Sequence, residues 1–168
     1  REFGENGIYK SLQLYNFLDN HDVNRLASTV KNQEHIFLLY ALLFTIPGIP
    51  SIYYGSEFGI FGKRGEYDDF ELRPSLPPFS QVPDFAKPII NSEELIKVIT
   101  KFSKIRKNQP AIQIGNYKEI SVTNETFAFE RKFNDVKIIV AVNISSEEKE
   151  IVLKNLQKED FGKNCKNL

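Results

Sequence analysis

The first ordered pattern along the chain is an apolar run that ends abruptly in polar residues. Both faces of a strand over residues 12–18 are apolar. One face carries Leu12, Leu14 and Leu18, and the other carries Tyr15 and Phe17. Such a strand is typical of a buried, usually parallel, sheet. It leads directly into D-N-H-D at residues 19–22, and in α/β barrels and sheets the functional groups follow the carboxyl ends of strands. A second interpretation is that Asp22 or Asn24 only caps a short helix.

The next segment, residues 36–44, is apolar on every side and predicts a helix that is covered nearly all round. Asn32 is its expected N-cap, with Glu34 in the first turn. A Pro-Gly pair ends this helix, and residues 50–54 read as a short strand. A strand, a helix and a strand at this spacing form one βαβ unit, which predicts a parallel sheet.

The middle of the chain combines an irregular segment with a clear helix. Residues 62–88 are rich in glycine and proline, and a loop of this length is commonly a functional insertion or lid, although a passive linker has the same composition. After it, Asn91 caps an amphipathic helix that ends at Asn108. The apolar stripe of this helix consists of Leu95, Val98, Ile99, Phe102 and Ile105. A stripe at this spacing predicts core packing rather than a binding surface.

Toward the C-terminus the apolar residues recur at every second position. This period predicts four strands, at residues 117–122, 126–133, 136–143 and 149–153. Tight turns are expected at residues 123–125 and 134–135. The polar tail, residues 158–168, supplies no closing strand and leaves an open sheet edge. The chain therefore divides into an α/β part, residues 1–108, and a small antiparallel, β-sandwich-like part, residues 109–168, and each part is incomplete.

The composition excludes several classes of partner. Lys and Arg number 22 and so do Asp and Glu, so no net field attracts nucleic acid or an anionic membrane surface. The longest apolar region, residues 36–52, is interrupted by Thr, Pro and Gly and is no membrane span. The single cysteine, Cys165, excludes an internal disulfide. No signal peptide is visible, but the chain begins with Arg1 rather than Met, so we expect a piece of a larger protein, and the compartment stays unknown.

Two motifs then stand in order along the first third of the chain. The first is F-L-D-N-H-D at residues 17–22, with Arg25 three residues later, and the second is P-G-x-P-x-x-Y-Y-G-x-E over residues 47–57. Together they resemble the fourth conserved region and the eighth-strand entry of the alpha-amylase family of glycoside hydrolases. The resemblance continues to the C-terminal β domain of that family and covers virtually the whole chain. It implies the C-terminal part of a (β/α)8 TIM barrel followed by a small antiparallel β domain, truncated at both ends.

The resemblance also implies roles for individual residues. Family members are retaining enzymes in which an Asp attacks and a Glu serves as acid and then base. Asp22 matches the third carboxylate, which accepts hydrogen bonds from the sugar and stabilises its positively charged transition state. His21 matches a donor to the hydroxyls of the same sugar. Arg25 matches a position that some members use beside the neighbouring subsite and others use for structural or anion contacts. The implied substrate is an α-glucan or a related oligosaccharide.

Other residues near these motifs have more ordinary interpretations. We expect Asn20 to shape the turn that presents His21 and Asp22. Tyr53 and Tyr54 follow the second strand and either stack on sugars or pack, and Glu57 is expected to form a local hydrogen bond or cap. Calcium is common in the family, but no ligand cluster is seen in this sequence, and no cofactor is expected for this chain.

The two catalytic carboxylates of the family are expected upstream of Arg1. Asp68, Asp69 and Glu71 lie in a loop with no evident positioning partner, so none is assigned as a replacement. The chain is therefore expected to be inactive by itself. A cut barrel also predicts an exposed apolar face and self-association.

Two other functions are weighed against this one. A non-catalytic glycan-binding or interaction module requires exposed aromatic rings on the β part, with Tyr117, Phe127, Phe129 and Phe133 as candidates. Their alternating positions favour core packing instead. A metal hydrolase is disfavoured because His21 and His35 are the only histidines and have no ligand spacing.

Overall fold

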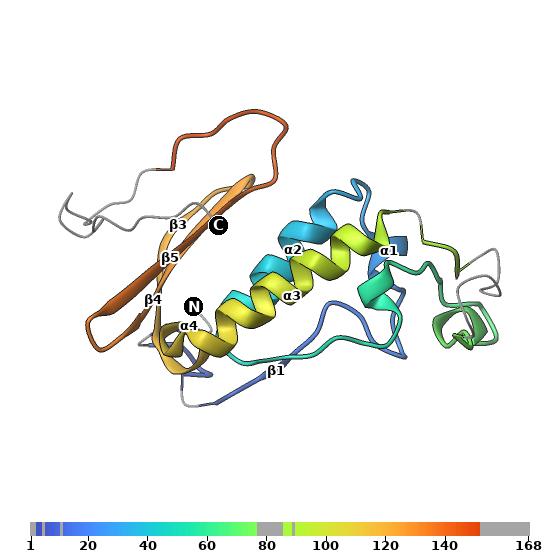
Figure 1. The fold of residues 1–168 in the computed structure, drawn as a ribbon, viewed down its shortest axis with the longest axis horizontal. Coiled ribbons are helices and arrows are strands. Elements are labelled where there is room, and N and C mark those ends of the chain that lie inside the picture. Colours follow the sequence, from blue (N-terminus) through green and yellow to red (C-terminus); the bar gives the residue numbers. More distant parts are fainter. Residues whose placement is uncertain (1–2, 5, 11, 77–85, 89, 152–168) are drawn as a thin grey trace.

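The computed structural model describes residues 3–4, 6–10, 12–76, 86–88 and 90–151. A pair of long helices lies at the centre, a three-stranded antiparallel sheet lies at one end, and an irregular loop extends from the other end (Figure 1). Within the described residues no helix is long and apolar enough to cross a membrane.

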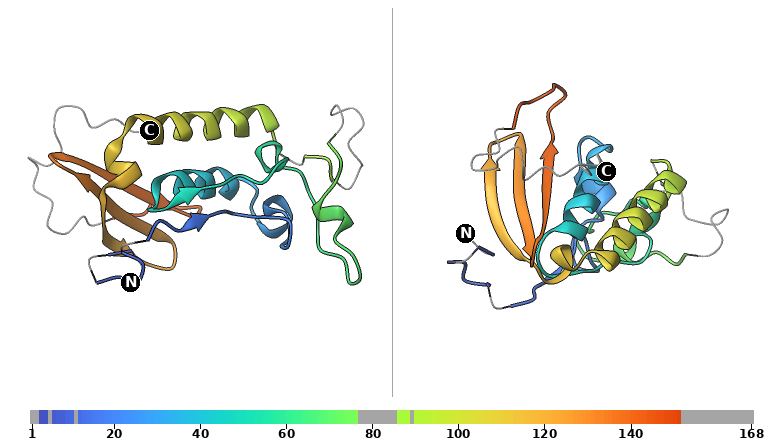
Figure 2. Two further views of the ribbon diagram at one scale, coloured as in Figure 1. Left: turned by 90° about the horizontal axis from the view of Figure 1, so that it is seen from below. Right: turned by 60° about the vertical axis from the view of Figure 1, so that its left-hand side comes forward.

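The predicted parallel strand pair is present but short. Strand β1 (Tyr15–Asn16) pairs in parallel with β2 (Ile49–Pro50), and the two arrows run side by side beneath the helices (Figure 2). The prediction that the first strand is buried on both faces is wrong for this structure, because its side chains Leu12, Tyr15 and Phe17 are all exposed. The two strands form a sheet of their own, and no third strand among the described residues pairs with them.

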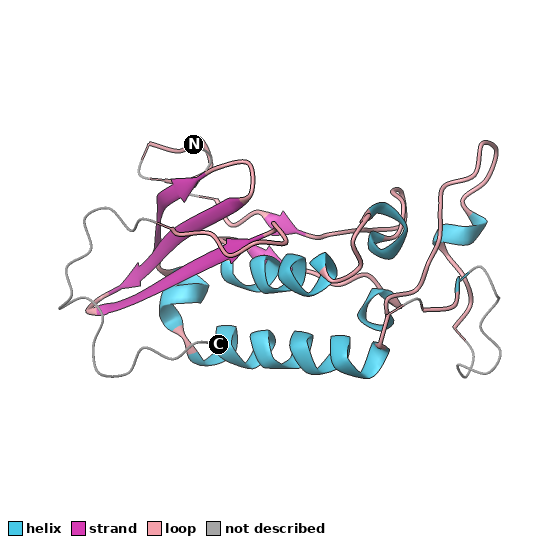
Figure 3. Cartoon of the chain, turned by 90° about the horizontal axis from the view of Figure 1, so that it is seen from above, coloured by secondary structure: helices cyan, strands magenta, loops and turns pink. Residues whose placement is uncertain are grey.

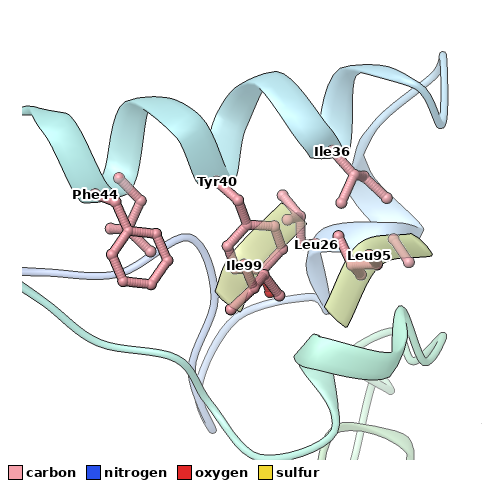
Figure 4. Close-up of a cluster of buried hydrophobic side chains, with 8 residues drawn as sticks. Leu26, Ile36, Tyr40, Phe44, Leu95 and Ile99 are labelled. Carbon is pink, nitrogen blue, oxygen red and sulfur yellow. The ribbon is translucent and has the colours of Figure 1, made fainter. Parts of the chain in front are cut away.

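The helical core forms from segments far apart in the sequence. Helix α1 (Leu26–Thr29) and helix α2 (His35–Thr45) pack with α3 (Ser92–Asn108). Their buried side chains meet between α2 and α3 (Figure 4); they are Leu26, Ala27, Ile36, Tyr40, Leu43, Phe44, Leu95 and Ile99. Asn32 is not the N-cap of α2, because its side chain accepts a hydrogen bond from the Glu34 amide and forms a turn before the helix begins.

The third helix is the element that the sequence predicts best. The side chain of Asn91 accepts a hydrogen bond of 3.2 Å from the Glu94 amide, as expected of an N-cap. Acidic residues occupy the first turn and basic residues the last, so both ends complement the helix dipole. A short helix, α4 (Pro110–Ile114), follows directly, starts with proline and leads into the sheet. The division into two domains at residues 108 and 109 stays a prediction.

The sheet confirms three of the four predicted strands. Strands β3 (Asn116–Val122), β4 (Thr126–Phe133) and β5 (Val136–Asn143) form an antiparallel sheet in sequential order (Figure 3). Turns fall at residues 123–125 and 134–135, as expected. The predicted fourth strand is wrong for residues 149–151, which are described and are not in a strand. Its last two residues and the tail 158–168 lie outside the described residues.

The long irregular segment contains little regular structure. Two short 3₁₀ helices, η1 (Ser56–Phe58) and η2 (Phe70–Leu72), interrupt it, and residues 77–85 and 89 lie outside the described residues. The loop between them leaves the helical body at the far end from the sheet (Figure 1). This placement brings the loop to the carboxyl ends of β1 and β2.

Candidate functional site

The site is built where two strands end. Strand β1 leads through residues 17–18 into the D-N-H-D segment, and β2 leads through residues 51–52 into the two tyrosines 53 and 54. Because β1 and β2 are parallel, their carboxyl ends lie at the same edge. Residues 37 positions apart, Asp19 and Ser56, are consequently in hydrogen-bond contact.

Asp19 forms the buried base of this site. Its carboxylate is 3% exposed and accepts a hydrogen bond of 2.8 Å from the Leu26 amide and others of 2.8 Å from the Ser56 hydroxyl. Burial raises the pKa of the Asp19 carboxyl, although these hydrogen bonds and the charge of Arg25 act in the opposite direction. Asp19 therefore holds the start of α1 next to the segment that follows β2.

Arg25 lies beneath the site rather than at its surface. Its side chain is 0% exposed, and its guanidinium donates to the carbonyls of Leu72 (3.0 Å) and Tyr54 (2.6 Å) and to the Ser56 hydroxyl (3.2 Å). The guanidinium carbon also lies 4.2 Å from the ring centroid of Tyr53, a cation–π arrangement. Burial lowers the pKa of the Arg25 guanidinium. Arg25 therefore has no exposed atom that could make the expected substrate contact. It instead contacts Tyr53 and Tyr54 from the interior of the protein.

His21 and Asp22, in contrast, are both exposed, with 59% and 61% of their side chains accessible. Nε2 of His21 lies 3.2 Å from Oδ2 of Asp22, so the two polar groups face the same space. The Asn20 side chain accepts a hydrogen bond of 2.8 Å from the Asp22 amide, which confirms its turn-shaping role. The ring of Tyr53 lies 6.4 Å from that of His21, so an aromatic surface borders the pair.

Arg73 is the residue at this site that the sequence interpretation missed. Its guanidinium lies 3.6 Å from Oδ1 of Asp22, pairs with Oδ2 of Asp69 at 3.0 Å and donates to the His21 carbonyl at 3.3 Å. The expectation that Asp69 has no positioning partner was therefore wrong, since Arg73 and Arg64 both pair with it. Asp69 and Arg73 stand four residues apart in the sequence, a spacing that indicates a possible ion pair. Nothing in the sequence, however, indicates that Arg73 reaches His21 and Asp22.

The neighbouring acidic residues also have partners or fixed positions. Glu71 accepts a hydrogen bond from the Lys63 amide, and Asp68 accepts one from the Phe70 amide, so both shape the loop. Oε2 of Glu57 is buried and has no hydrogen-bond partner among the described residues, so the expected local bond is not seen. Within the same described part of the chain, no cluster of three or more His, Cys, Asp or Glu side chains is arranged to hold a metal ion.

The arrangement offers both hydrogen-bond donors and acceptors to a ligand that carries hydroxyl groups. An exposed carboxylate, an imidazole and a guanidinium together supply acceptors and donors within a few ångströms of one another. The buried Asp19 and Arg25 hold the backbone that carries them, which keeps these groups in place without occupying the surface.

Known proteins share much of this sequence and fold. Residues 6–136 match the family described as "Alpha amylase, catalytic domain". A cyclomaltodextrin glucanotransferase of Niallia circulans is 33% identical over 127 residues, which make up 76% of this chain and 16% of that relative.

Two solved structures have a similar arrangement of the chain. A maltogenic amylase from S. marinus matches with a TM-score of 0.66 and 31% identity, covering 83% of this chain and 19% of that one. An alpha-amylase from Geobacillus thermoleovorans, complexed with acarbose, matches with a TM-score of 0.64 and 27% identity, covering 80% and 28%. The chain thus spans less than a third of the length of each of these proteins.

Proposed function

The chain belongs to the alpha-amylase family, and we propose that it forms the C-terminal part of a retaining α-glycosidase that hydrolyses or transfers α-glucosidic bonds in starch-like glucans. The family fold contains a TIM barrel. In this proposal β1 and β2 are the seventh and eighth strands of that barrel, and β3–β5 begin the C-terminal β domain. The names of the relatives, a glucanotransferase and amylases, support this class of substrate.

The observation that carries the proposal is the exposed His21–Asp22 pair above a buried support. Asp22 accepts hydrogen bonds from the hydroxyls of the sugar at the cleaved bond and stabilises the positive charge that develops on its ring. His21 donates from a ring nitrogen to hydroxyls of the same sugar. Arg25 acts as a positioning residue, because it holds Tyr53 and the backbone of Tyr54 while remaining buried.

The proposal includes no nucleophile and no acid among these residues. Asp68, Asp69 and Glu71 are engaged within their own loop, and Asp19 is buried in contact with Ser56 and Leu26. Positioning groups alone do not perform the two-carboxylate displacement of a retaining enzyme. We therefore expect the isolated chain to be silent and a larger protein to be active.

Hydrolysis of a chromogenic maltooligosaccharide tests this proposal. The substrate is offered to the chain alone and to the Niallia circulans glucanotransferase in which this chain replaces the matched 127 residues. We expect the chimera to react with retention of the anomeric configuration and the chain alone to be inactive. Asp22→Asn should lower the kcat of the chimera by about 10²–10³-fold, the effect of removing one transition-state contact.

Asp135→Asn is the matched control. Asp135 is an exposed carboxylate in the turn between β4 and β5, outside the proposed site, and its replacement should leave the rate unchanged. Turnover by the isolated chain would show that it carries its own nucleophile and acid. An active chimera that tolerates Asp22→Asn would remove the role assigned to Asp22.

No observation favours the glycan-binding module over this proposal. Phe129 is fully buried, and its ring packs 5.4 Å from Tyr117 and 5.2 Å from Phe127. Phe133 is only partly exposed. Tyr117, Phe127 and Phe129 thus share a packed cluster and do not form an exposed, flat platform.

A further inference from the structure

A pocket with a volume of about 420 Å³ lies where α2 and α3 end and α4 begins. Its lining consists of Phe44, Pro50, Ser103, Arg106, Lys107 and Gln113. Two of these side chains are cations and none is a carboxylate. Arg106 donates to the carbonyl of Gly48, the residue before β2, so the pocket lies at the amino end of that strand. The His21–Asp22 pair lies at the other end, past the carboxyl ends of β1 and β2.

Positive charge gathers beside this pocket without a carboxylate to balance it. Arg106 donates to the carbonyls of Phe44 and Ile46. Arg131 donates to the carbonyl of Thr45 between them, so the two guanidiniums bind consecutive residues. Neither arginine forms an ion pair within the part of the chain that the structure describes. Burial, and then the nearby charge of Arg106, lowers the pKa of Arg131, although buried charges in proteins are normally paired.

The helix ends do not cancel this charge. A helix C-terminus carries a partial charge of about −0.5, so the ends of α2 and α3 together supply about one negative charge. Arg106, Arg131 and Lys107 bring three positive charges at neutral pH. The Nε atom of Arg131 is also buried and has no hydrogen-bond partner among the described residues. The local excess of positive charge therefore favours an anion beside these residues.

Three donor groups at the pocket are free to bind an anion. The Ser103 hydroxyl and the Lys107 ammonium group are exposed and form no hydrogen bond or ion pair with any residue that the structure describes. The carbonyl contacts of Arg106 use its two terminal nitrogens, which leaves Nε. The three residues stand at positions i, i+3 and i+4 of α3 and so share one face of the helix. A hydroxyl, a guanidinium and an ammonium group on one face form a donor set that suits phosphate oxygens.

We propose that this pocket binds a phosphate monoester, with the phosphate oxygens on Ser103, Arg106 and Lys107. Pockets of about 300–1,000 Å³ hold small organic ligands, so this one has room for more than the phosphate group. Phe44 and Pro50 give the organic part of the ligand an apolar wall. The inference goes beyond the proposed function, because it concerns a second ligand at the opposite end of β2.

Calorimetric titration of the 168-residue chain with phenyl phosphate and with inorganic phosphate, at one ionic strength set with NaCl, tests this inference. We expect both to bind, and phenyl phosphate to bind more tightly because its ring packs on the apolar wall. Phenol, the uncharged control, should not bind. Acetate should bind more weakly than inorganic phosphate, because a carboxylate has fewer oxygens for the three donors.

Arg106 is a poor residue to replace, because it also holds the end of α2. Ser103 and Lys107 bond to no described residue, so their variants should fold normally. We expect Ser103→Ala and Lys107→Ala each to weaken phenyl phosphate binding about three- to tenfold, the effect of losing one hydrogen bond to a charged group. Lys107→Arg should retain the affinity. Lys97→Ala is the matched control, because it removes the same charge from an exposed position of α3 outside the pocket.

The outcomes distinguish a built site from a general attraction of anions. Equal weakening by Lys107→Ala and Lys97→Ala would show that the charge of α3 acts as a whole and would overturn the site. Acetate binding as tightly as inorganic phosphate would overturn the phosphate class, and so would absence of phosphate binding. His21→Ala should retain the affinity for phenyl phosphate, and its loss would place the ligand at the sugar site instead. Thermal unfolding of Ser103→Ala and Lys107→Ala without ligand, expected to match the unmodified chain, establishes that their effect is on binding.

Discussion

The guanidinium of Arg131, on strand β4, donates a hydrogen bond of 2.9 Å to the carbonyl of Thr45, the last residue of helix α2, across 86 positions of sequence. Its second terminal nitrogen donates to the Gly115 carbonyl at 2.9 Å. Arg106 of α3 donates in the same region, to the carbonyls of Phe44 and Ile46. A helix C-terminus presents carbonyls without partners and a partial negative charge. The two arginines satisfy these carbonyls and join the sheet to the helices.

We predict that Arg131→Met lowers the free energy of unfolding by about 2–3 kcal/mol, because two hydrogen bonds from a charged donor are lost and the Thr45 carbonyl stays buried. Burial lowers the pKa of Arg131 to about 10, which leaves it charged at neutral pH. Urea unfolding measures the effect. Lys132→Met, an exposed neighbour on the same strand, should change stability by less than about 0.5 kcal/mol, and equal effects of the two variants would contradict the bridging role.

Asp19 predicts a specific dependence of stability on pH. Its pKa is raised by burial above the ordinary 3.8, so between pH 3.8 and the raised value the folded chain binds more protons than the unfolded chain. The free energy of unfolding contributed by this group therefore falls as pH rises through that window. Asp19→Asn lacks this contribution, so the unmodified chain should lose stability relative to the variant as the pH rises from about 4 through the raised pKa of Asp19.

Chemical unfolding of both proteins across this pH range measures the difference. The control is Asp135→Asn, which removes an exposed carboxylate and should give a curve parallel to that of the unmodified chain. Parallel curves for Asp19→Asn would show that the buried carboxyl does not titrate differently in the folded chain.

Gly48→Ala should destabilise the parallel strand pair. Gly48 has a φ of +110°, and an added Cβ would lie 2.5 Å from the Leu14 carbonyl and closer still to the Asn16 side chain. Strain of this kind costs at least about 2 kcal/mol. Gly4→Ala is the matched control, because a Cβ there meets no atom within 4 Å. Urea unfolding should show a large loss for the first variant and none for the second.

Arg25→Leu should be among the most damaging single changes. It removes the donor to the Tyr54 and Leu72 carbonyls and to Ser56, and it leaves the buried Asp19 without its nearby positive charge. Removal of one partner from a buried charged network costs about 3–5 kcal/mol. Arg64→Leu removes a mostly exposed arginine and should cost less than about 1 kcal/mol. Thermal unfolding distinguishes the two, and similar losses would contradict the supporting role of Arg25.

Much of the fold was predictable because it depends on neighbours along the chain. The alternation of apolar residues over 126–133 and 136–143 predicts strands β4 and β5. Asn91 predicts the start of α3, because its side chain caps the helix by accepting a hydrogen bond from the amide of Glu94, only three residues away. The parallel pairing of β1 with β2 follows from the strand, helix and strand order. The sequence also determined the family, since two motifs at a set spacing are properties of the chain itself.

The tertiary structure alone decided which polar residues of the motif lie at the surface. Asp19, His21, Asp22 and Arg25 stand within seven positions, yet the first and last are buried and the middle pair is exposed. That division depends on partners far away in sequence, such as Ser56 beneath the site and Arg73, which reaches the His21 carbonyl across 52 positions. Periodicity and spacing report on adjacent residues, whereas burial and charge pairing depend on which distant segments the packed helices and strands bring together.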